Sequence, residues 1–266
     1  MQNKKEAMSL AYDEAGTGQA VLFIHGYPLN RQMWQPQIAA LSAAGFRVIA
    51  PDLRGFGESA AGESPGTMDA MADDLVHLLD QLQIEKATVA GMSMGGYVLL
   101  NLLNRYPQRV NAACFVVTRS DADDASGRAK RNHLITEIEA GRPQAVAEAF
   151  IPALFAPDTI QTRPEMVEMV RSWISATSAT GLIHGLQAIR DRVDSTPLLA
   201  TLQVPTLVIG AEEDQAIPPE KSRDLATRIP TAKLSMLPAV GHMANLENPN
   251  QFNQVFIDFL RSVPAG

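Results

Sequence analysis

Short runs of apolar, often β-branched residues alternate along the chain with longer segments in which apolar residues recur every three or four positions. This alternation is typical of βαβ units. We expect strands at 20–26, 47–52, 87–91, 113–117, 206–210 and 232–237. Most of these runs are apolar at successive positions, and therefore on both faces of the strand. The pattern predicts an α/β fold in which helices cover both faces of a mostly parallel sheet.

Two segments have the spacing of helices that pack on such a sheet. One helix is expected after Thr67, whose side chain is suited to capping the first turn. Its apolar stripe comprises Met68, Met71, Leu75, Leu78 and Leu82. The last helix is expected after Asn248 as its cap, with Pro249 in the first turn. Its apolar residues recur at helical spacing, so we expect them to serve the core.

The alternation stops between residues 119 and 201, where helical segments and prolines replace any convincing strand. Two consecutive parallel strands need a crossover of only about a dozen residues. We therefore expect an inserted helical cap at 119–201, and a core formed by 1–118 and 202–266. The apolar underside of the cap is expected to comprise Phe150, Ile151, Leu154, Phe155, Met166, Met169, Trp173 and Ile174. We expect each of these side chains to hold the cap together rather than to contact substrate.

Composition narrows the range of partners. The 266 residues are 46% hydrophobic, which suits one large core, and the formal net charge is −7. A nucleic-acid or anionic-membrane surface would need clustered excess Lys and Arg, so neither partner is expected. The sequence shows no apolar leader and no run long enough to span a membrane, which predicts a cytoplasmic protein. Cys114 is the single cysteine; it excludes an internal disulfide and, within an apolar run, is expected to be buried.

Ser93 lies in the sequence Gly91-Met92-Ser93-Met94-Gly95, between a predicted strand and a predicted helix. A G-x-S-x-G match by itself is often a simple turn. At a strand-to-helix bend, however, the serine hydroxyl is exposed above the sheet and lies near the helix amino end, where negative charge is favoured. Glycines on both sides allow the close approach of strand and helix. This context favours Ser93 as a nucleophile.

A serine nucleophile needs a general base and an acid that orients the base. Of the five histidines, His242 follows the last predicted strand in a loop with Gly241, where no helix constrains the imidazole. Its position in the chain favours it as the base over the alternative of a solvated surface residue. The strand at 206–210 leads into three acidic residues, and we choose Asp214 as the acid, with Glu213 as the main rival.

The order Ser93, Asp214, His242, together with FIHGYP near the start and DLRGFGES after the next strand, resembles the α/β-hydrolase superfamily. The resemblance extends from about residue 20 to residue 260. It implies the α/β-hydrolase fold with an inserted helical cap. The family places its acid four residues after the glycine of the strand, here Gly210, which supports Asp214.

The resemblance also implies an oxyanion hole made by the backbone N–H groups of Tyr27 and Met94. In the family, the histidine at the position of His25 usually shapes the loop. No metal and no organic cofactor are implied. The DLRGFGES residues Arg54, Gly55, Gly57 and Ser59 are expected to serve loop architecture rather than catalysis.

The expected function is hydrolysis of a small carboxylic ester through an acyl-enzyme. Within the superfamily, the motifs are similar to those of 3-oxoadipate enol-lactonase-like esterases and cofactor-free perhydrolases. A lactonase is therefore an alternative, and Arg128, Lys130 and Arg131 are candidates to attract an acidic acyl group, although such a cluster is usually a solvated helix face. A weakly catalytic receptor on the same fold is a third reading. The sequence leaves the acyl and alcohol specificity and the oligomeric state open.

Overall fold

The computed structural model describes residues 8–63 and 65–264, which form a seven-stranded sheet. The first residues of the chain, on which part of the cytoplasmic prediction depends, lie outside this range. The spatial order of the strands is β1-β3-β2-β4-β5-β6-β7. The strands are β1 (Tyr12–Ala15), β2 (Ala20–Ile24), β3 (Arg47–Pro51), β4 (Ala87–Met92), β5 (Val110–Val116), β6 (Thr206–Ala211) and β7 (Ala232–Leu237). All neighbouring pairs are parallel except β1 with β3.

The six strands expected from the sequence are all present, whereas β1 was missed. Every residue of β4 and β6 is buried, as expected for central parallel strands covered on both faces. β1 has the sequence YDEA, with an exposed or half-buried side chain at every position, so it carries no apolar signal. It is defined instead by its antiparallel pairing with β3, which brings Tyr12 opposite Pro51. A tertiary partner, rather than local sequence, makes this edge strand.

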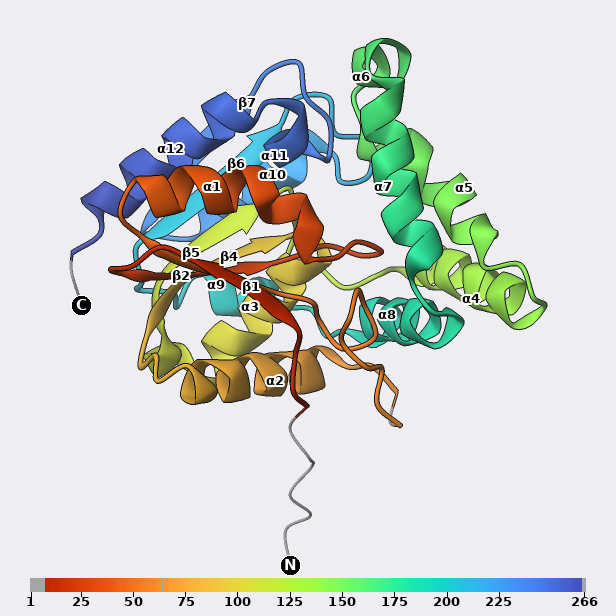
Figure 1. Cartoon of the computed structure of the whole chain (residues 1–266), viewed down its shortest axis with the longest axis horizontal. Helices are drawn as coiled ribbons and strands as arrows, with labels where there is room; N and C mark the ends of the chain where they lie inside the picture. Colours follow the sequence, from red (N-terminus) through yellow and green to blue (C-terminus); the bar gives the residue numbers. More distant parts are fainter. Residues whose placement is uncertain (1–7, 64, 265–266) are drawn as a thin grey trace, which may run out of the picture.

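Helices cover both faces of the sheet. In Figure 1, α1 (Gln35–Ala43) and α12 (Pro249–Ser262) lie on one face, while α2 (Met68–Gln81) and α3 (Met94–Arg105) lie on the other. The remaining helices of the core are η1 (Arg31–Trp34), η2 (Pro107–Arg109), α10 (Pro219–Arg228) and α11 (Ala244–Glu247). Both expected caps are observed. Thr67 Oγ1 accepts a hydrogen bond from the Ala70 N–H, and the Asn248 side chain accepts one from the Gln251 N–H.

Residues 117–205, all of which are described, contain helices and no strand. These helices are α4 (Ala125–Glu139), α5 (Gln144–Leu154), α6 (Pro157–Thr162), α7 (Pro164–Ala176), α8 (Ala179–Asp191) and α9 (Thr196–Leu199). Figure 1 shows α4 to α7 beside the sheet rather than on one of its faces, with α4 packed on α8. Of the expected apolar underside, Ile151, Leu154, Phe155 and Ile174 are buried. Met169 is 40% exposed, so the expectation that it belongs to the underside was wrong.

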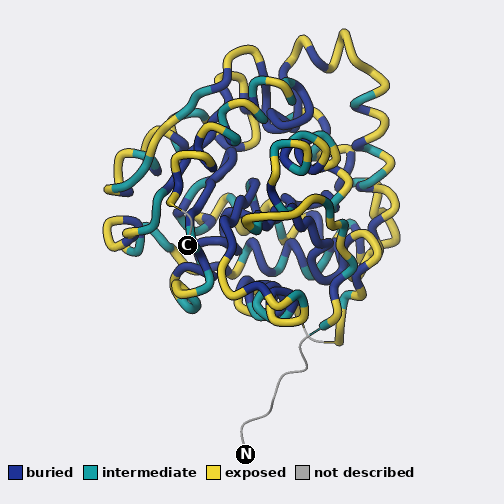
Figure 2. The backbone as a smooth tube through the Cα atoms, turned by 60° about the vertical axis from the view of Figure 1, so that its left-hand side comes forward, coloured by how far each residue is buried: buried dark blue, intermediate teal, exposed yellow. Residues whose placement is uncertain are grey.

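The hydrophobic core is continuous from the sheet into its covering helices. Trp34, Phe23, Phe252 and Phe256 are fully buried between the sheet and α12, where the Phe23 and Trp34 rings stack with centroids 4.5 Å apart. Figure 2 shows the same distribution, with buried backbone in the centre and exposed loops and outer helix turns around it. None of the helices in the described residues combines the length and apolar character needed to cross a membrane.

Candidate active site

Ser93 lies at the sharp corner between β4 and α3. Its backbone has φ 53° and ψ −114°, a conformation that a non-glycine residue rarely adopts. Three hydrogen bonds hold this corner: Ser93 N–H donates to Val116 O at 3.0 Å, and Ser93 O accepts from Gly96 N–H at 2.9 Å and from Thr118 Oγ1 at 2.7 Å. The strain is therefore supported by β5 and the residues that follow it.

The two glycines of the motif lie where backbones approach too closely for a side chain. A Cβ at Gly91 would overlap the backbone of Gly95, and a Cβ at Gly95 would lie 2.8 Å from His25 O and also overlap Ile24 O. The strand, the helix and the loop after β2 therefore meet at one point. This agrees with the expectation from sequence that small residues permit the bend.

His242 and Asp214 meet above the carboxyl ends of β6 and β7. His242 Nδ1 lies 2.7 Å from Asp214 Oδ2, and both side chains are almost fully buried. Asp214 Oδ1 accepts hydrogen bonds of 2.9 Å from the N–H groups of Ala216 and Ile217, which fix the carboxylate. Because an ionised carboxylate only accepts hydrogen bonds, Nδ1 carries a proton, so a neutral imidazole in this position has its lone pair on Nε2. This is the tautomer that a general base requires.

The rival acid, Glu213, does not reach the imidazole. Its side chain is exposed, and its N–H donates to Val240 O at 3.0 Å. The neighbouring Glu212 is paired with Arg223 at 2.7 Å on the surface. Of the three acidic residues after β6, the structure brings only Asp214 to His242.

Ser93 and His242 line one cavity of about 410 Å³, together with Tyr27 and Met94. Ser93 Oγ and the imidazole make no hydrogen bond in the part of the chain that is described; in unliganded sites this contact is often long. Met94 is the first residue of α3, so its N–H has no partner within the helix. The Tyr27 N–H donates to none of the described residues. Both N–H groups are therefore available at the serine corner.

His25 and Cys114 do not line this cavity. His25 is buried; its Nε2 accepts a hydrogen bond from the Leu53 N–H at 2.9 Å, while Nδ1 donates to Gly26 O at 2.8 Å. Burial lowers the pKa of His25, consistent with a neutral ring that shapes the loop. Cys114 is fully buried, and burial raises the pKa of its thiol well above the usual value.

The DLRGFGES loop is held by side chains, as expected. Arg54 forms a buried ion pair with Asp74 at 2.6 Å, and Ser59 Oγ donates to Asp52 O at 2.8 Å. The first contact attaches the loop to α2, and the second joins the two ends of the loop. Among the described residues, no group of three His, Cys, Asp or Glu side chains is arranged to hold a metal ion.

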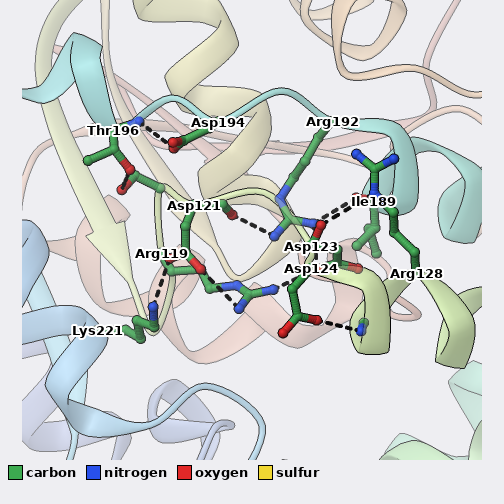
Figure 3. Close-up of polar contacts among 12 residues, drawn as sticks. Arg119, Asp121, Asp123, Asp124, Arg128, Ile189, Arg192, Asp194, Thr196 and Lys221 are labelled. Atoms are coloured by element: carbon green, nitrogen blue, oxygen red, sulfur yellow. Dashed lines mark hydrogen bonds and ion pairs between the residues drawn. The ribbon is translucent and has the colours of Figure 1, made fainter.

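One part of the cavity wall is charged. Four cationic side chains and three carboxylates line it: Arg119, Lys130, Arg131, Lys221, Asp121, Asp123 and Asp124. Figure 3 shows the network, in which the buried Asp123 accepts from Arg119 at 2.6 Å and from Arg192 at 2.8 Å. Burial opposes the charge of this carboxylate, but Arg192 and Arg131 outweigh that effect and hold the pKa of Asp123 below its usual range.

Most of this charged wall was not predicted from the sequence. Only Lys130 and Arg131 of the expected basic cluster line the cavity; Arg128, on the same helix, does not. The missed residues 118–124 directly follow β5, and ligands in parallel α/β sheets bind outside the carboxyl ends of strands. Their position after a predicted strand could therefore have indicated that these residues line a ligand site. Phe150 and Leu154 also line the cavity, so the expected apolar underside reaches this cavity at two positions.

A second cavity, of about 450 Å³, lies on the other side of Tyr97, a residue that both cavities share. It is bounded by the start of α2 and the end of α8, and neither Ser93 nor His242 contributes to it. We therefore place the candidate site in the cavity of Ser93.

The model of the α/β-hydrolase fold family matches residues 19–249. The chain belongs to this family. This membership confirms the fold class and the resemblance inferred from the motifs.

Similar proteins of known structure or function cover nearly the whole chain. A thermophilic esterase from Thermogutta terrifontis, whose structure has malate bound, is 35% identical, with a TM-score of 0.95 over 99% of this chain and 97% of that one. 3-Oxoadipate enol-lactonase 2 of Acinetobacter baylyi is 32% identical over 93% of this chain and 92% of its own length. A bromoperoxidase from Bacillus anthracis is 25% identical, with a TM-score of 0.86 and coverage of 97% of both chains.

Proposed function

We propose that this protein is a serine hydrolase that cleaves small carboxylic esters through an acyl-enzyme, with Ser93 as nucleophile, His242 as base and Asp214 as orienting acid. One observation carries the proposal: the 2.7 Å contact of Asp214 with His242 Nδ1 directs the other ring nitrogen to a cavity that Ser93 also lines. The esterase from Thermogutta and the lactonase from Acinetobacter, both similar over almost their full lengths, support the same reaction class.

In the proposed acylation, Ser93 Oγ attacks the ester carbonyl carbon while His242 Nε2 takes the hydroxyl proton. Asp214 stabilises the imidazolium. The backbone N–H groups of Tyr27 and Met94 hold the oxyanion of the tetrahedral intermediate, and loss of one such donor typically costs about 10²- to 10³-fold in rate. When the intermediate collapses, the alcohol leaves with the proton from His242.

Deacylation repeats these steps with water. His242 takes a proton from the water as its oxygen attacks the acyl carbon, and collapse releases the acid while Ser93 recovers its proton. We further propose that residues 119–201 act as a cap over a core of 1–118 and 202–266, because Lys130, Arg131, Phe150 and Leu154 line the cavity of Ser93. A cytoplasmic location stays a prediction from the sequence.

A second candidate is a substrate that carries an additional carboxylate, as in a lactonase of the enol-lactonase type. Cations outnumber carboxylates on the cavity wall, and Lys130 forms no ion pair within the described residues. The similar esterase has been seen with malate, a dicarboxylate. The same Ser93 chemistry would open a lactone, so this candidate changes the substrate and not the mechanism.

The test is turnover of p-nitrophenyl acetate by the wild-type protein and by Ser93→Ala. We expect the substitution to lower kcat by about 10⁴-fold or more, the scale on which a triad member acts. Retention of most activity would reject Ser93 as the nucleophile. A wild-type protein no faster than Ser93→Ala on esters, lactones and thioesters would instead indicate the receptor alternative.

A further inference from the structure

Glu247 is a buried acid that the mechanism does not use. It is the last residue of α11, and only 3% of it is exposed. Its carboxylate accepts three hydrogen bonds: Oε1 from the Gly241 N–H at 2.9 Å, and Oε2 from the Ala156 N–H at 3.0 Å and from Thr159 Oγ1 at 2.6 Å. Gly241 precedes His242, whereas Ala156 and Thr159 belong to the region between β5 and β6. The carboxylate therefore joins the loop that carries His242 (residues 238–243, the histidine loop) to the cap.

A second hydrogen bond makes the same connection on the other side of His242. The Met243 N–H donates to Leu154 O, the last residue of α5, at 2.8 Å. In addition, a Cβ at Gly241 would overlap the backbone of Phe155 and Ala156, so the loop and the corner at 154–159 are in direct contact. The residues before and after His242 are thus both attached to that corner.

The donors around Glu247 require a carboxylate. Oε1 and Oε2 both accept hydrogen bonds, so a glutamine would direct its NH₂ group toward one of the N–H groups. Burying an acid is costly unless it is paired. The cation beside it, Arg163, donates to Glu247 O at 2.7 Å rather than to the carboxylate. An apolar side chain would avoid the cost of burial but would leave three donors without a partner.

We propose that Glu247 is a positioning residue that fixes His242 relative to Ser93 by tying the histidine loop to the corner at 154–159. The proposal rests on the function proposed above, since it needs His242 as the base. The corner includes Leu154, which lines the cavity. The part of the cap that lines the cavity and His242 therefore move as one unit, so that a displacement of the cap also displaces the imidazole.

The experiment compares kcat and KM of Glu247→Gln, Thr159→Val and Thr162→Val with the wild-type protein. Thr162 is the matched control, because its Oγ1 donates to Asp158 O within α6 and does not contact Glu247. We expect Glu247→Gln to lower kcat by about 10- to 100-fold with little change in KM, since small misplacements of a catalytic group have effects of this size. Thr159→Val should lower kcat less, by roughly 3- to 10-fold, and Thr162→Val should leave it unchanged.

The same Glu247→Gln change is then made in a His242→Ala background. If Glu247 acts through His242, it should have no further effect on the residual activity there. An equal reduction in both backgrounds, or a Thr159→Val enzyme no slower than Thr162→Val, would overturn the positioning role. Full activity of His242→Ala by itself would instead reject the proposed function, so the two failures are distinguishable.

Discussion

The two sides of the Ser93 cavity are held in place by different kinds of contact. On the core side, the corner at Ser93 depends on main-chain hydrogen bonds and on glycines against which other backbones pack directly. On the cap side, charged side chains converge on Asp123, and the Arg131 guanidinium lies 5.9 Å from the Phe150 ring centroid. The corner at Ser93 is therefore held by the backbone, whereas the charged part of the cap side is held by side chains that can be substituted individually.

This difference separates reaction chemistry from substrate choice. Backbone positions that admit no Cβ cannot shift by much, which suits a nucleophile and an oxyanion hole that must remain in register. Ion pairs and aromatic contacts can be replaced one at a time without moving the sheet. We therefore expect substitutions on the core side to affect kcat or folding, and substitutions on the cap side to affect KM and substrate preference.

After loss of the nucleophile itself, the largest effect is expected at Asp214. Asp214→Asn should lower kcat by roughly 10³- to 10⁴-fold, because an amide can donate to Nδ1 and stabilise the wrong imidazole tautomer. Glu213→Gln is the matched control, since that side chain is exposed and lies one residue away. Steady-state kinetics with p-nitrophenyl acetate measure both variants. If Glu213→Gln were the slower enzyme, the acid would have to be reassigned and the core side described here would be wrong.

A comparison of two glycines tests the difference between the two sides directly. Gly95→Ala would bring its Cβ to 2.8 Å from His25 O, and should destabilise the fold by about 1–3 kcal/mol or more through overpacking. Gly141, between α4 and α5, differs in both respects: its φ is positive, and a Cβ there would meet open space. Gly141→Ala should therefore cost only about 1 kcal/mol, from the left-handed backbone.

Urea unfolding measures the two costs, and the rate of ester hydrolysis provides a second measurement. Gly95→Ala should also lower kcat, because it displaces the loop that carries Tyr27, whereas Gly141→Ala should not. Equal stabilities and equal rates for the two variants would contradict the view that the core side is held by backbone contact.

The core side could be predicted from the sequence because its determinants are local. Ser93 is flanked by glycines at a strand-to-helix junction, and the strand at 206–210 leads directly into Asp214, so both positions are defined by short motifs. The inserted helices were predicted from the length of the interval without a strand. The catalytic roles of Ser93 and Asp214 stay predictions until the substitutions are measured.

The rest depends on contacts between distant segments. β1 exists because it pairs with β3, and its own residues carry no apolar pattern. Met169 shares helical spacing with buried residues but faces outward, since the orientation of α7 is set by packing with α5. Glu247 is separated from Thr159 by 88 positions, so no local pattern indicates their hydrogen bond. Tertiary contacts determine these three features, and the periodicity of the sequence does not indicate them.

Glu247 lies where the two sides meet, and its protonation should be visible in stability. Burial raises the pKa of this carboxyl above the ordinary 4.5, against the opposing effect of its three donors and Arg163. The pKa is thus higher in the folded than in the unfolded state, so between these two pKa values the folded state binds more protons. The contribution of Glu247 to stability is therefore present at low pH and lost as the pH rises. Relative to Glu247→Gln, the wild-type protein should lose stability as the pH rises from about 4.5 through the raised pKa of the folded state.

Urea unfolding of both proteins at several pH values gives this difference, in which the other titrating groups cancel. A difference that moves in favour of the wild-type protein as the pH rises would mean that the three donors lower the pKa. The link between core and cap would then be stronger in its ionised form than burial suggests.

The smallest effect is expected at Lys130, on the exposed part of the cap wall. If its charge attracts a substrate carboxylate, Lys130→Gln should raise KM for a p-nitrophenyl monoester of succinate by about 1.5- to 5-fold, the range of an exposed ion pair, and this effect should weaken with added salt. KM for the neutral acetate ester should not change. Arg128→Gln removes the same charge from the same helix outside the cavity, so it controls for net charge. A similar rise in KM for both variants would mean that the overall charge of α4 causes the effect. It would contradict a specific contact between Lys130 and the substrate carboxylate.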